Sequence, residues 1–470
     1  MHFSYNRVAS NDRSVHSPDS FRSVYSPSVY SPREIKAVAA AIDQSIRPRP
    51  FFYQPREYIP RFIESPQEKQ QQHQHQQIPR ALSQKPFLYF DNAASTAVLP
   101  DVLTAMIPML TDQYANPEAS HAAGKLARDN MEMCRADVAN AFRVIPEEIY
   151  FTSGASESIN TFIRGVCHSN CSATKRKLVI STIEHKAVSA TCADMDKEGY
   201  TVVRVPVNSD GIIDLDALAD AVDDETLLAC IIMANNEIGV LQPIEEISRI
   251  VHSAGALLFS DTTQIAGKFP IFPKQLGIDA LCISGHKIHG PKGIGALYMS
   301  ADIECAPIIT GGHQERGQRA GTSNTPGING MVAAIRYNLS PAGQHQHRHV
   351  KNQRDWVIAK LKEQTQPGRV IVHCENAPRV NNIISASFLN SRGRPLDKAD
   401  MMQFLNDRNI IVSTGSACNA GSDRSDVLES IGLDPITAAS TLRISLSVLT
   451  DRDQCERLAQ SLLEMMHTFA

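Results

Sequence analysis

The sequence lacks three features that would each mark out a class of protein. Its 470 residues contain no run of about 18 uncharged apolar residues, which excludes a membrane-spanning helix. Its ten cysteines are scattered along a long chain and make no disulfide framework, and none forms a Cys-x-x-Cys pair, so zinc-site spacing is absent. With 46 basic and 50 acidic residues the formal net charge is only −4, and no basic field predicts nucleic acid as a partner. The composition therefore predicts an ordinary globular protein in a reducing compartment.

The N-terminus also lacks the apolar segment of a secretory signal, which favours a cytoplasmic location. Its Ser- and Arg-rich character leaves a mitochondrial location open, although Asp12 and Asp19 count against it.

Residues 1–86 have a composition unlike the rest of the chain. They contain SPDS, YSPSVYSP and a Gln/His tract at 70–77, and such a bias cannot bury enough apolar surface to offset the entropy of ordering. We expect a disordered extension with one short helix at Pro32–Gln44, where Pro-Arg-Glu opens an Ala-rich stretch. The Gln/His tract could bind a metal, but a flexible tail is the favoured interpretation.

From about Lys85 onward, strand and helix signals alternate. Apolar strand-like runs occur at 148–152, 177–181, 227–233, 256–260, 279–283 and 294–299, with helical periodicity at 121–142 and 244–254. This alternation predicts an α/β fold in which helices cover a mostly parallel sheet. Strands at 382–388, 409–413 and 441–447 follow a helical stretch at 344–366 and predict a smaller α+β domain. We therefore divide the chain into a large domain at 100–343 and a small domain formed by 87–99 and 344–470.

Small or hydrogen-bonding residues follow each predicted strand of the large domain. The strand ends read SGASE from Ser153, EHK from Glu184, NNEIG from Asn235, DTTQ from Asp261 and SGHK from Ser284. Open α/β sheets bind ligands at the carboxyl ends of their strands, so these ends predict one cofactor site. Ser153–Ser156 before a helix could cradle a phosphate or simply cap that helix. Asp261 could likewise be a buried cap or the partner of a protonated pyridine nitrogen.

Lys287 is the most informative of these residues. It lies between an apolar strand and the Gly-rich turn HGPKGIG, an unusual place for a solvated charge. Desolvation lowers the pKa of a lysine and makes its amine available for a Schiff base. The nearby Lys292 is the alternative candidate.

Seven strings, in order and spacing, resemble the cysteine desulfurases of the NifS/IscS type. They are FTSGASESIN, EHKAV, NNEIGVLQPI, SDTTQIAGKFP, SGHKIHGPKGIGALY, GGHQERGQRAGT and STGSACNAGS. The resemblance begins near Tyr89 and covers the chain to its C-terminus. It implies the fold type I of pyridoxal-phosphate enzymes, with a mostly parallel seven-stranded sheet, in the class-V aminotransferase family.

The resemblance also implies roles for individual residues. Lys287 would hold the aldehyde of pyridoxal 5′-phosphate and move the α-proton, while His185 would stack on the ring and assist proton transfer. Asp261 would pair with the pyridine nitrogen and Gln264 with the phenolic oxygen. The remaining cofactor and substrate ligands would be Ala155, Ser156, Ser284 and His286 at the phosphate, Asn236 beside the ring and the substrate, Thr322 at the phosphate of a second subunit, and Arg443 with Asn382 at the substrate carboxylate. A homodimer follows from the role of Thr322.

Cys418 determines which reaction is predicted. Of the ten cysteines it alone lies in a Gly/Ser/Ala stretch, Ser413–Gly421, which suits an exposed thiolate, whereas a buried cysteine is inert. An unreactive loop cysteine is the other interpretation. The resemblance implies that L-cysteine is converted to L-alanine, with its sulfur left on Cys418 as a persulfide. An acceptor protein would then take this sulfur for iron–sulfur cluster assembly or thiolation.

The sequence departs from the family pattern at three places. Ser156 replaces the usual Thr, His313 stands where Gly is usual, and only 27 residues follow Arg443. Ser156 keeps the hydroxyl group of the usual Thr. A residue other than Gly at position 313 predicts a different local backbone conformation, and the short C-terminal tail weakens the prediction that sulfur is transferred to a scaffold protein. Two alternatives stay open: a selenocysteine lyase or another lyase of the same fold, and a non-catalytic interaction protein that uses the N-terminal tail.

Overall fold

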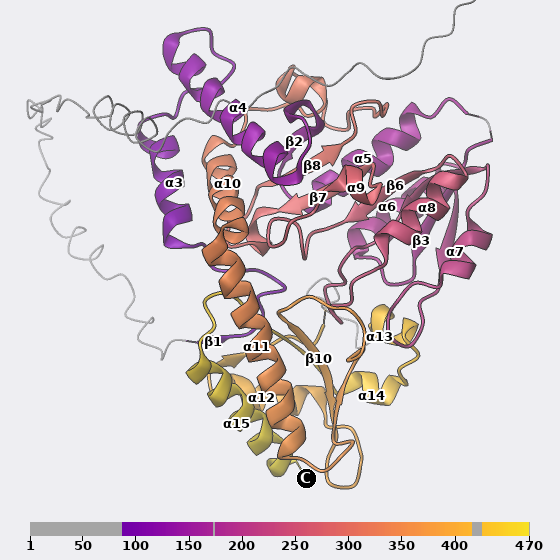
Figure 1. Cartoon of the computed structure of the whole chain (residues 1–470), viewed down its shortest axis with the longest axis vertical. Helices are drawn as coiled ribbons and strands as arrows, with labels where there is room; N and C mark the ends of the chain where they lie inside the picture. Colours follow the sequence, from indigo (N-terminus) through magenta and orange to yellow (C-terminus); the bar gives the residue numbers. More distant parts are fainter. Residues whose placement is uncertain (1–86, 173, 416–424, 470) are drawn as a thin grey trace, which may run out of the picture. The chain divides into compact units, whose positions relative to one another are not determined.

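The computed structural model describes residues 87–172, 174–415 and 425–469, all of them within the compact unit Gln84–Ala470 (Figure 1). The predicted disordered extension at 1–86, the predicted helix at Pro32–Gln44 and the predicted nucleophile Cys418 lie outside the described residues.

A seven-stranded sheet in the order β2-β8-β7-β6-β5-β3-β4 forms the larger core. Only β8 runs antiparallel to its neighbours, and the other four strand pairs are parallel, which confirms the prediction of a mostly parallel sheet. The strands are β2 (Ile149–Thr152), β3 (Lys177–Ser181), β4 (Thr201–Val205), β5 (Thr226–Cys230), β6 (Leu257–Asp261), β7 (Ala280–Ser284) and β8 (Gly295–Met299).

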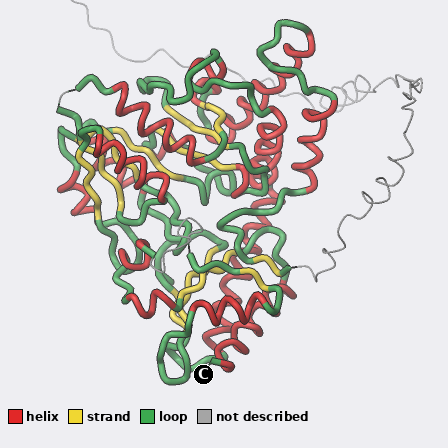
Figure 2. Tube along the Cα trace, turned by 180° about the vertical axis from the view of Figure 1, so that it is seen from behind, coloured by secondary structure: helices red, strands yellow, loops and turns green. Residues whose placement is uncertain are grey.

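Alternate residues of these strands pack into two separate apolar cores, one on each face of the sheet. On β3, Val179 packs into one core, while Leu178 and Ile180 pack into the other. Figures 1 and 2 show the strands flanked by helices on both sides. Because both faces are buried, the strands are continuous apolar runs without polar alternation.

The helices divide between the two faces. The first core takes side chains from α4 (Ala122–Phe142), α8 (Ile244–Ser253) and α10 (Thr325–Leu339), and the second from α5 (Ala155–Ser169) and α6 (Lys186–Lys197). The other helices and helical turns of this part are α3 (Pro100–Thr111), α7 (Leu215–Ala221), α9 (Pro273–Leu276), η2 (Pro146–Glu148), η3 (Gly285–Lys287) and η4 (Gln314–Gly317). None of the described helices is both long enough and apolar enough to cross a membrane.

A further core lies around two small sheets. The antiparallel sheet β12-β10-β9 and the parallel pair β1-β11 share it with α11, α12 and α15. The elements are β1 (Leu88–Tyr89), β9 (Val370–Val372), β10 (Ile383–Phe388), β11 (Ile410–Ile411), β12 (Thr441–Ser445), α11 (Pro341–Glu363), α12 (Lys398–Asn406), α13 (Asp426–Ser430), α14 (Pro435–Ala439) and α15 (Arg452–Thr468). The first described strand therefore pairs with one more than 300 residues later, Leu88 opposite Ile410.

The sequence analysis did not predict three of the strands, namely β1, β4 and β9. β4 is one of the two edge strands, and its residues are largely exposed or half-buried, so Thr201–Val205 carries no continuous apolar run. β1 and β9 have only two and three residues, too few to show a period.

The backbone at His313 is ordinary, with φ −90° and ψ 14°, so the missing glycine causes no strain there. Positive φ values occur instead at Glu315 (48°) and Arg316 (57°). The buried Glu315 carboxylate accepts hydrogen bonds from Arg135 at 2.6 and 2.9 Å and from the Phe151 N–H at 2.8 Å. This ion pair, rather than the residue at 313, holds the turn against the sheet.

Candidate active site

A cavity of about 520 Å³ opens where β2, β3, β5, β6 and β7 end. Its wall includes residues that follow each of these strands, the segment Ala93–Ser95, and Arg443 from β12. Residues from distant parts of the chain thus meet at the carboxyl edge of the sheet, as the strand ends predicted.

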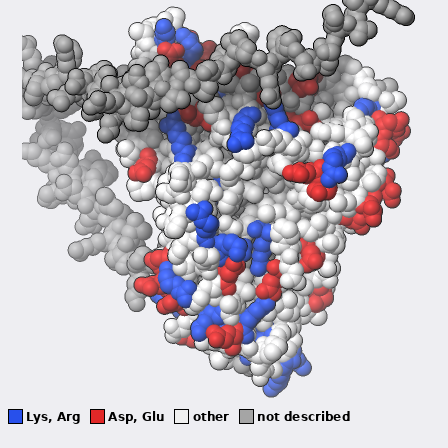
Figure 3. All heavy atoms as spheres, in the orientation of Figure 1, with Lys and Arg blue, Asp and Glu red and all other residues white. Residues whose placement is uncertain are grey.

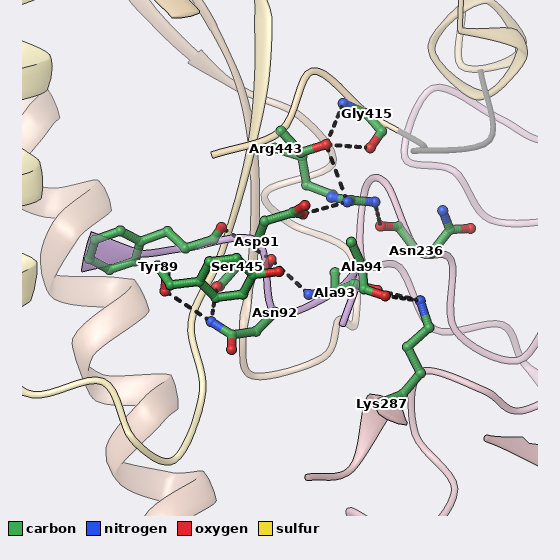
Figure 4. Close-up of polar contacts among 12 residues, drawn as sticks. Tyr89, Asp91, Asn92, Ala93, Ala94, Asn236, Lys287, Gly415, Arg443 and Ser445 are labelled. Atoms are coloured by element: carbon green, nitrogen blue, oxygen red, sulfur yellow. Dashed lines mark hydrogen bonds and ion pairs between the residues drawn. The ribbon is translucent and has the colours of Figure 1, made fainter. Parts of the chain in front are cut away.

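Lys287 enters the cavity from a tight turn directly after β7. A Cβ on Gly285 would lie 2.9 Å from both the Pro291 carbonyl oxygen and Ile294 Cγ2, so only glycine permits this turn. The Lys287 amine donates hydrogen bonds to the carbonyl oxygens of Ala93 at 2.7 Å and Ala94 at 2.9 Å (Figure 4). A partly buried amine is therefore held at a defined point in the cavity.

The N-terminus of α5 forms another part of the wall. Gly154 precedes the helix with φ +155° and, as a glycine, has no side chain to cap the first turn. Ala155, Ser156, Ser284 and His286 all line the cavity around this end. Because the first N–H groups of a helix lack partners within it, this wall suits an anionic group such as a phosphate. Burial first, then the charges of Lys287 and Lys292, lower the pKa of His286 to about 4, so this imidazole is neutral at pH 7.

Asp261 is the last residue of β6, and the described residues hold it through one of its two carboxylate oxygens. Its Oδ1 accepts hydrogen bonds from the Thr263 N–H at 3.0 Å and from the Cys282 thiol at 3.3 Å. Burial raises the pKa of the Cys282 thiol well above its ordinary value, so this group remains a proton donor. The carboxylate is thereby oriented in the cavity wall, and no hydrogen bond among the described residues reaches its Oδ2.

Gln264 carries an unsatisfied polar atom in the same wall. Its Nε2 donates to the Ala93 carbonyl at 3.0 Å, and its buried Oε1 has no hydrogen-bond partner among the described residues. A buried amide oxygen without a partner is costly, so this position indicates a polar ligand.

Arg443 faces the cavity from β12 and is itself only 2% exposed. It donates to the Asn236 carbonyl at 2.9 Å and to Asp91 Oδ1 at 2.7 Å, and its Nε has no partner among the described residues (Figure 4). His185 also lines the cavity, at the N-cap of α6, where its Nδ1 accepts a hydrogen bond from the Ala187 N–H at 3.1 Å.

Residues 88–458 match the model of the family described as "Aminotransferase class-V", which is most of the chain. The chain belongs to the class-V aminotransferase family.

Named relatives of this class-V aminotransferase are cysteine desulfurases. A "Cysteine desulfurase IscS" of Methanosarcina thermophila is 35% identical over 382 residues, which are 81% of this chain and 92% of the relative. Among solved structures, a "NifS-like protein" has a TM-score of 0.74 at 33% identity and covers 81% of this chain and 100% of its own. A structure titled "SspA in complex with cysteine" has a TM-score of 0.67 at 35% identity, covering 76% and 98%. These matches confirm the expected fold.

Most of the residues singled out from the sequence lie together in this class-V aminotransferase. The cavity is lined by Ala155, Ser156, His185, Asn236, Asp261, Gln264, Ser284, His286, Lys287 and Arg443. Asn382 does not line it but faces a smaller neighbouring cavity, with its Nδ2 donating to the Leu446 carbonyl at 3.3 Å. Thr322 is exposed and does not line the cavity of its own chain. Cys418 falls outside the described residues.

The sequence analysis missed two residues that orient the site, Asp91 and Cys282. Asp91 pairs with Arg443 from a segment read only as the start of the resemblance. Cys282 lies opposite Asp261 in the register of β6 and β7, so a correct strand pairing could have found it.

Proposed function

We propose that this class-V aminotransferase is a cysteine desulfurase that uses pyridoxal 5′-phosphate to convert L-cysteine to L-alanine and transfers the sulfur to Cys418. One observation carries the proposal: an amine (Lys287), an oriented carboxylate (Asp261), the N-terminus of α5 and a buried arginine (Arg443) line a single cavity.

The donors in the cavity fit the proposed cofactor. Pyridoxal 5′-phosphate carries an aldehyde, a basic ring nitrogen, a ring oxygen and a phosphate, and each meets a group of matching chemistry. Lys287 would hold the aldehyde carbon, Asp261 the ring nitrogen, Gln264 the ring oxygen, and the α5 N-terminus the phosphate. The partnerless Oε1 of Gln264 supports a polar ligand at this point of the wall. When bound, the cofactor supplies an electron sink for charge that develops at the substrate α-carbon.

The residues of the chain would then bind the substrate and move its protons. Arg443 would take the substrate carboxylate in a bidentate pair, because its buried side chain lines the cavity and a planar guanidinium offers two parallel N–H groups to a carboxylate. Lys287 Nζ would accept the α-proton and later return it. His185 would assist this transfer, since an imidazole can both accept and donate a proton.

Cys418 would complete the reaction as nucleophile. Its thiolate would attack the sulfur of the substrate, so that an S–S bond forms, the C–S bond breaks, and alanine leaves after protonation. The side chain lies outside the described residues, and support for its role is the motif STGSACNAGS. An acceptor protein for iron–sulfur assembly or thiolation would then take the sulfur.

The proposal includes a homodimer, with Thr322 reaching the phosphate in the neighbouring subunit. Leu103, Ile107 and Leu110 are 48–59% exposed on one stretch of α3, where an apolar face on a monomer would contact water. We also propose the division into a large domain at 100–343 and a small domain at 87–99 and 344–470, which the β1–β11 pair supports.

Figure 3 shows basic and acidic side chains interspersed on the face of the molecule that it draws.

Alanine release from L-cysteine by the purified, cofactor-loaded protein tests the proposed function. We expect stoichiometric alanine and protein-bound sulfane sulfur. Selenocysteine turnover without turnover of L-cysteine would identify a selenocysteine lyase instead, and turnover of neither by a cofactor-loaded protein would contradict the proposal.

Arg443→Lys should raise the KM for L-cysteine by about 10- to 100-fold, because lysine cannot form the bidentate pair with the carboxylate. The measurement is steady-state kinetics with L-cysteine, and cysteamine, which lacks the carboxylate, is the control substrate. An unchanged KM for L-cysteine would place the carboxylate elsewhere.

A further inference from the structure

A second, smaller cavity of about 20 Å³ lies behind Lys287. Lys287 lines this cavity as well as the larger one, so this residue is shared by the two cavities. The surface of the small cavity is mainly apolar, and several polar side chains also line it, among them Lys268, His289, His347 and Asn382. Its volume has room for about one water molecule, and its walls offer the hydrogen-bonding groups that a water needs.

Lys268 is the unusual group in this cavity. Its side chain is buried, with the residue only 7% exposed, and among the described residues its Nζ has neither a hydrogen-bond partner nor an ion pair. No carboxylate among the described residues lines the cavity. Burial first, and then the charge of Lys287, lower the pKa of Lys268 from 10.5 to about 7. A buried lysine without a counter-charge gains and loses its proton easily near neutral pH.

The two histidines that face Lys268 are both neutral acceptors. His289 Nδ1 lies 2.8 Å from the Ala97 carbonyl oxygen and must donate to it, which leaves Nε2 with a lone pair. Asn338 donates through its Nδ2 to two carbonyl oxygens, so its Oδ1 accepts from His347 Nε2 at 2.9 Å and Nδ1 of His347 keeps a lone pair. Burial first, and then nearby charge from Lys268, lower the pKa of His347 to about 3. Burial also lowers the pKa of His289 to about 4.

The titratable groups that face Lys268 are therefore one amine, Lys287, and two imidazoles that stay neutral at pH 7. Coupling between two charges is reciprocal, so a proton on either lysine disfavours a proton on the other. The imidazole lone pairs can accept hydrogen bonds from a charged Lys268 through the water, without any carboxylate.

We propose that Lys268 is the proton-sharing partner of Lys287: the pair holds one proton at neutral pH, on Lys268 when the Lys287 nitrogen is uncharged and on Lys287 when it is charged. The transfer passes through the water of the small cavity. An N–H bond of Lys268 breaks as the water takes that proton, and an O–H proton of the water forms the new bond at Lys287. The reverse steps return it, and no other bond changes. The inference rests on the proposed function only in assigning Lys287 as the lysine that holds the cofactor.

The test compares the pH at which the Lys287 nitrogen gains its proton in Lys268→Met, the wild type and Lys268→Arg. Spectrophotometric titration of the full-length protein loaded with pyridoxal phosphate reports this midpoint from the absorbance of the cofactor. Removing the second amine makes protonation of Lys287 easier, and a permanent charge makes it harder. We expect the midpoint for the Lys287 nitrogen to lie about one pH unit higher in Lys268→Met than in Lys268→Arg. The midpoint of the wild type should lie between these two values or equal one of them. Equal midpoints, or the reverse order, would overturn the proposal.

A matched control variant and a measurement without cofactor test this proposal independently of the proposed function. Lys292 also lines the larger cavity but is exposed, so solvent screens it, and Lys292→Met and Lys292→Arg should differ far less. Trace labelling of Lys287 with acetic anhydride in the full-length protein without cofactor should give the same ranking for the Lys268 variants. That measurement needs neither cofactor nor L-cysteine, so a failure of the proposed function leaves it interpretable.

The stability of the protein distinguishes a titrating Lys268 from one that only packs. Because folding lowers the pKa of Lys268, the unfolded chain binds more protons between pH 7 and 10.5, and the free energy of unfolding of the wild type should rise with pH across that interval. Lys268→Met should lose that part of the rise and be no less stable than the wild type at pH 7. A similar loss of stability in both variants, with no difference between their midpoints, would identify a packing role and overturn the proposal.

Discussion

Lys287→Ala should lower the turnover of L-cysteine by about a thousandfold or more. The amine is proposed both to hold the cofactor and to move the α-proton, and general acid–base transfer alone contributes on the order of 10²–10⁴ in rate. In the structure Lys287 Nζ is fixed by two carbonyl oxygens at 2.7 and 2.9 Å, and among the described lysines only Lys292 also lines the larger cavity.

Steady-state alanine release measures this effect, and the absorbance of bound cofactor measures retention. Lys197→Ala is the matched control, because Lys197 lies on the surface of α6 and pairs with Asp194 at 2.9 Å. Near-normal turnover in Lys287→Ala would remove this lysine from the mechanism and leave Lys292 as the candidate.

Cys418→Ser should abolish sulfur transfer and lower alanine release by at least about a hundredfold. A serine hydroxyl keeps the size of the side chain, but it neither attacks sulfur nor holds a persulfide, since the thiolate is the nucleophile. The variant should still bind the cofactor, because the residues proposed to hold it lie elsewhere.

Mass spectrometry of the Cys418 peptide after a single turnover detects the added sulfur directly. Cys171→Ser is the control, because Cys171 is the exposed cysteine among the described residues and does not line the cavity. Equal alanine release by Cys418→Ser and the wild type would mean that sulfur leaves by another route, as in a lyase.

The strand ends allowed residues that line the candidate cavity to be predicted, because parallel strands bring their carboxyl ends to one edge whatever their separation in sequence. Lys287, Asp261 and Ser156 come from different segments and meet in one cavity for that reason. Asp91 was not identified, since its partner Arg443 is 352 residues away and only the β1–β11 and β12 packing brings them together.

Lys268 shows a different limit of sequence analysis. In the string AGKFP a lysine resembles an ordinary turn residue exposed to water. Its burial depends on α10 and α11, which supply Asn338 and His347 to the wall of the small cavity. The residues next to Lys268 in the sequence do not determine this packing with distant helices, so its burial could be recognised only in the folded structure.

The pairing of β1 with β11 sets a limit on how the N-terminus can be processed. The segment from Leu88 to Ser95 first adds a strand to a small sheet, then pairs Asp91 with Arg443, and finally presents two carbonyl oxygens to Lys287. A protease that removed the preceding extension would leave these contacts intact as long as it cut before Leu88. A cut a few residues after Leu88 would remove β1 from its sheet, and a cut after Ala94 would also remove the partner of Arg443 and the two carbonyl oxygens that hold Lys287. A catalytic chain therefore has to retain the segment that begins at Leu88.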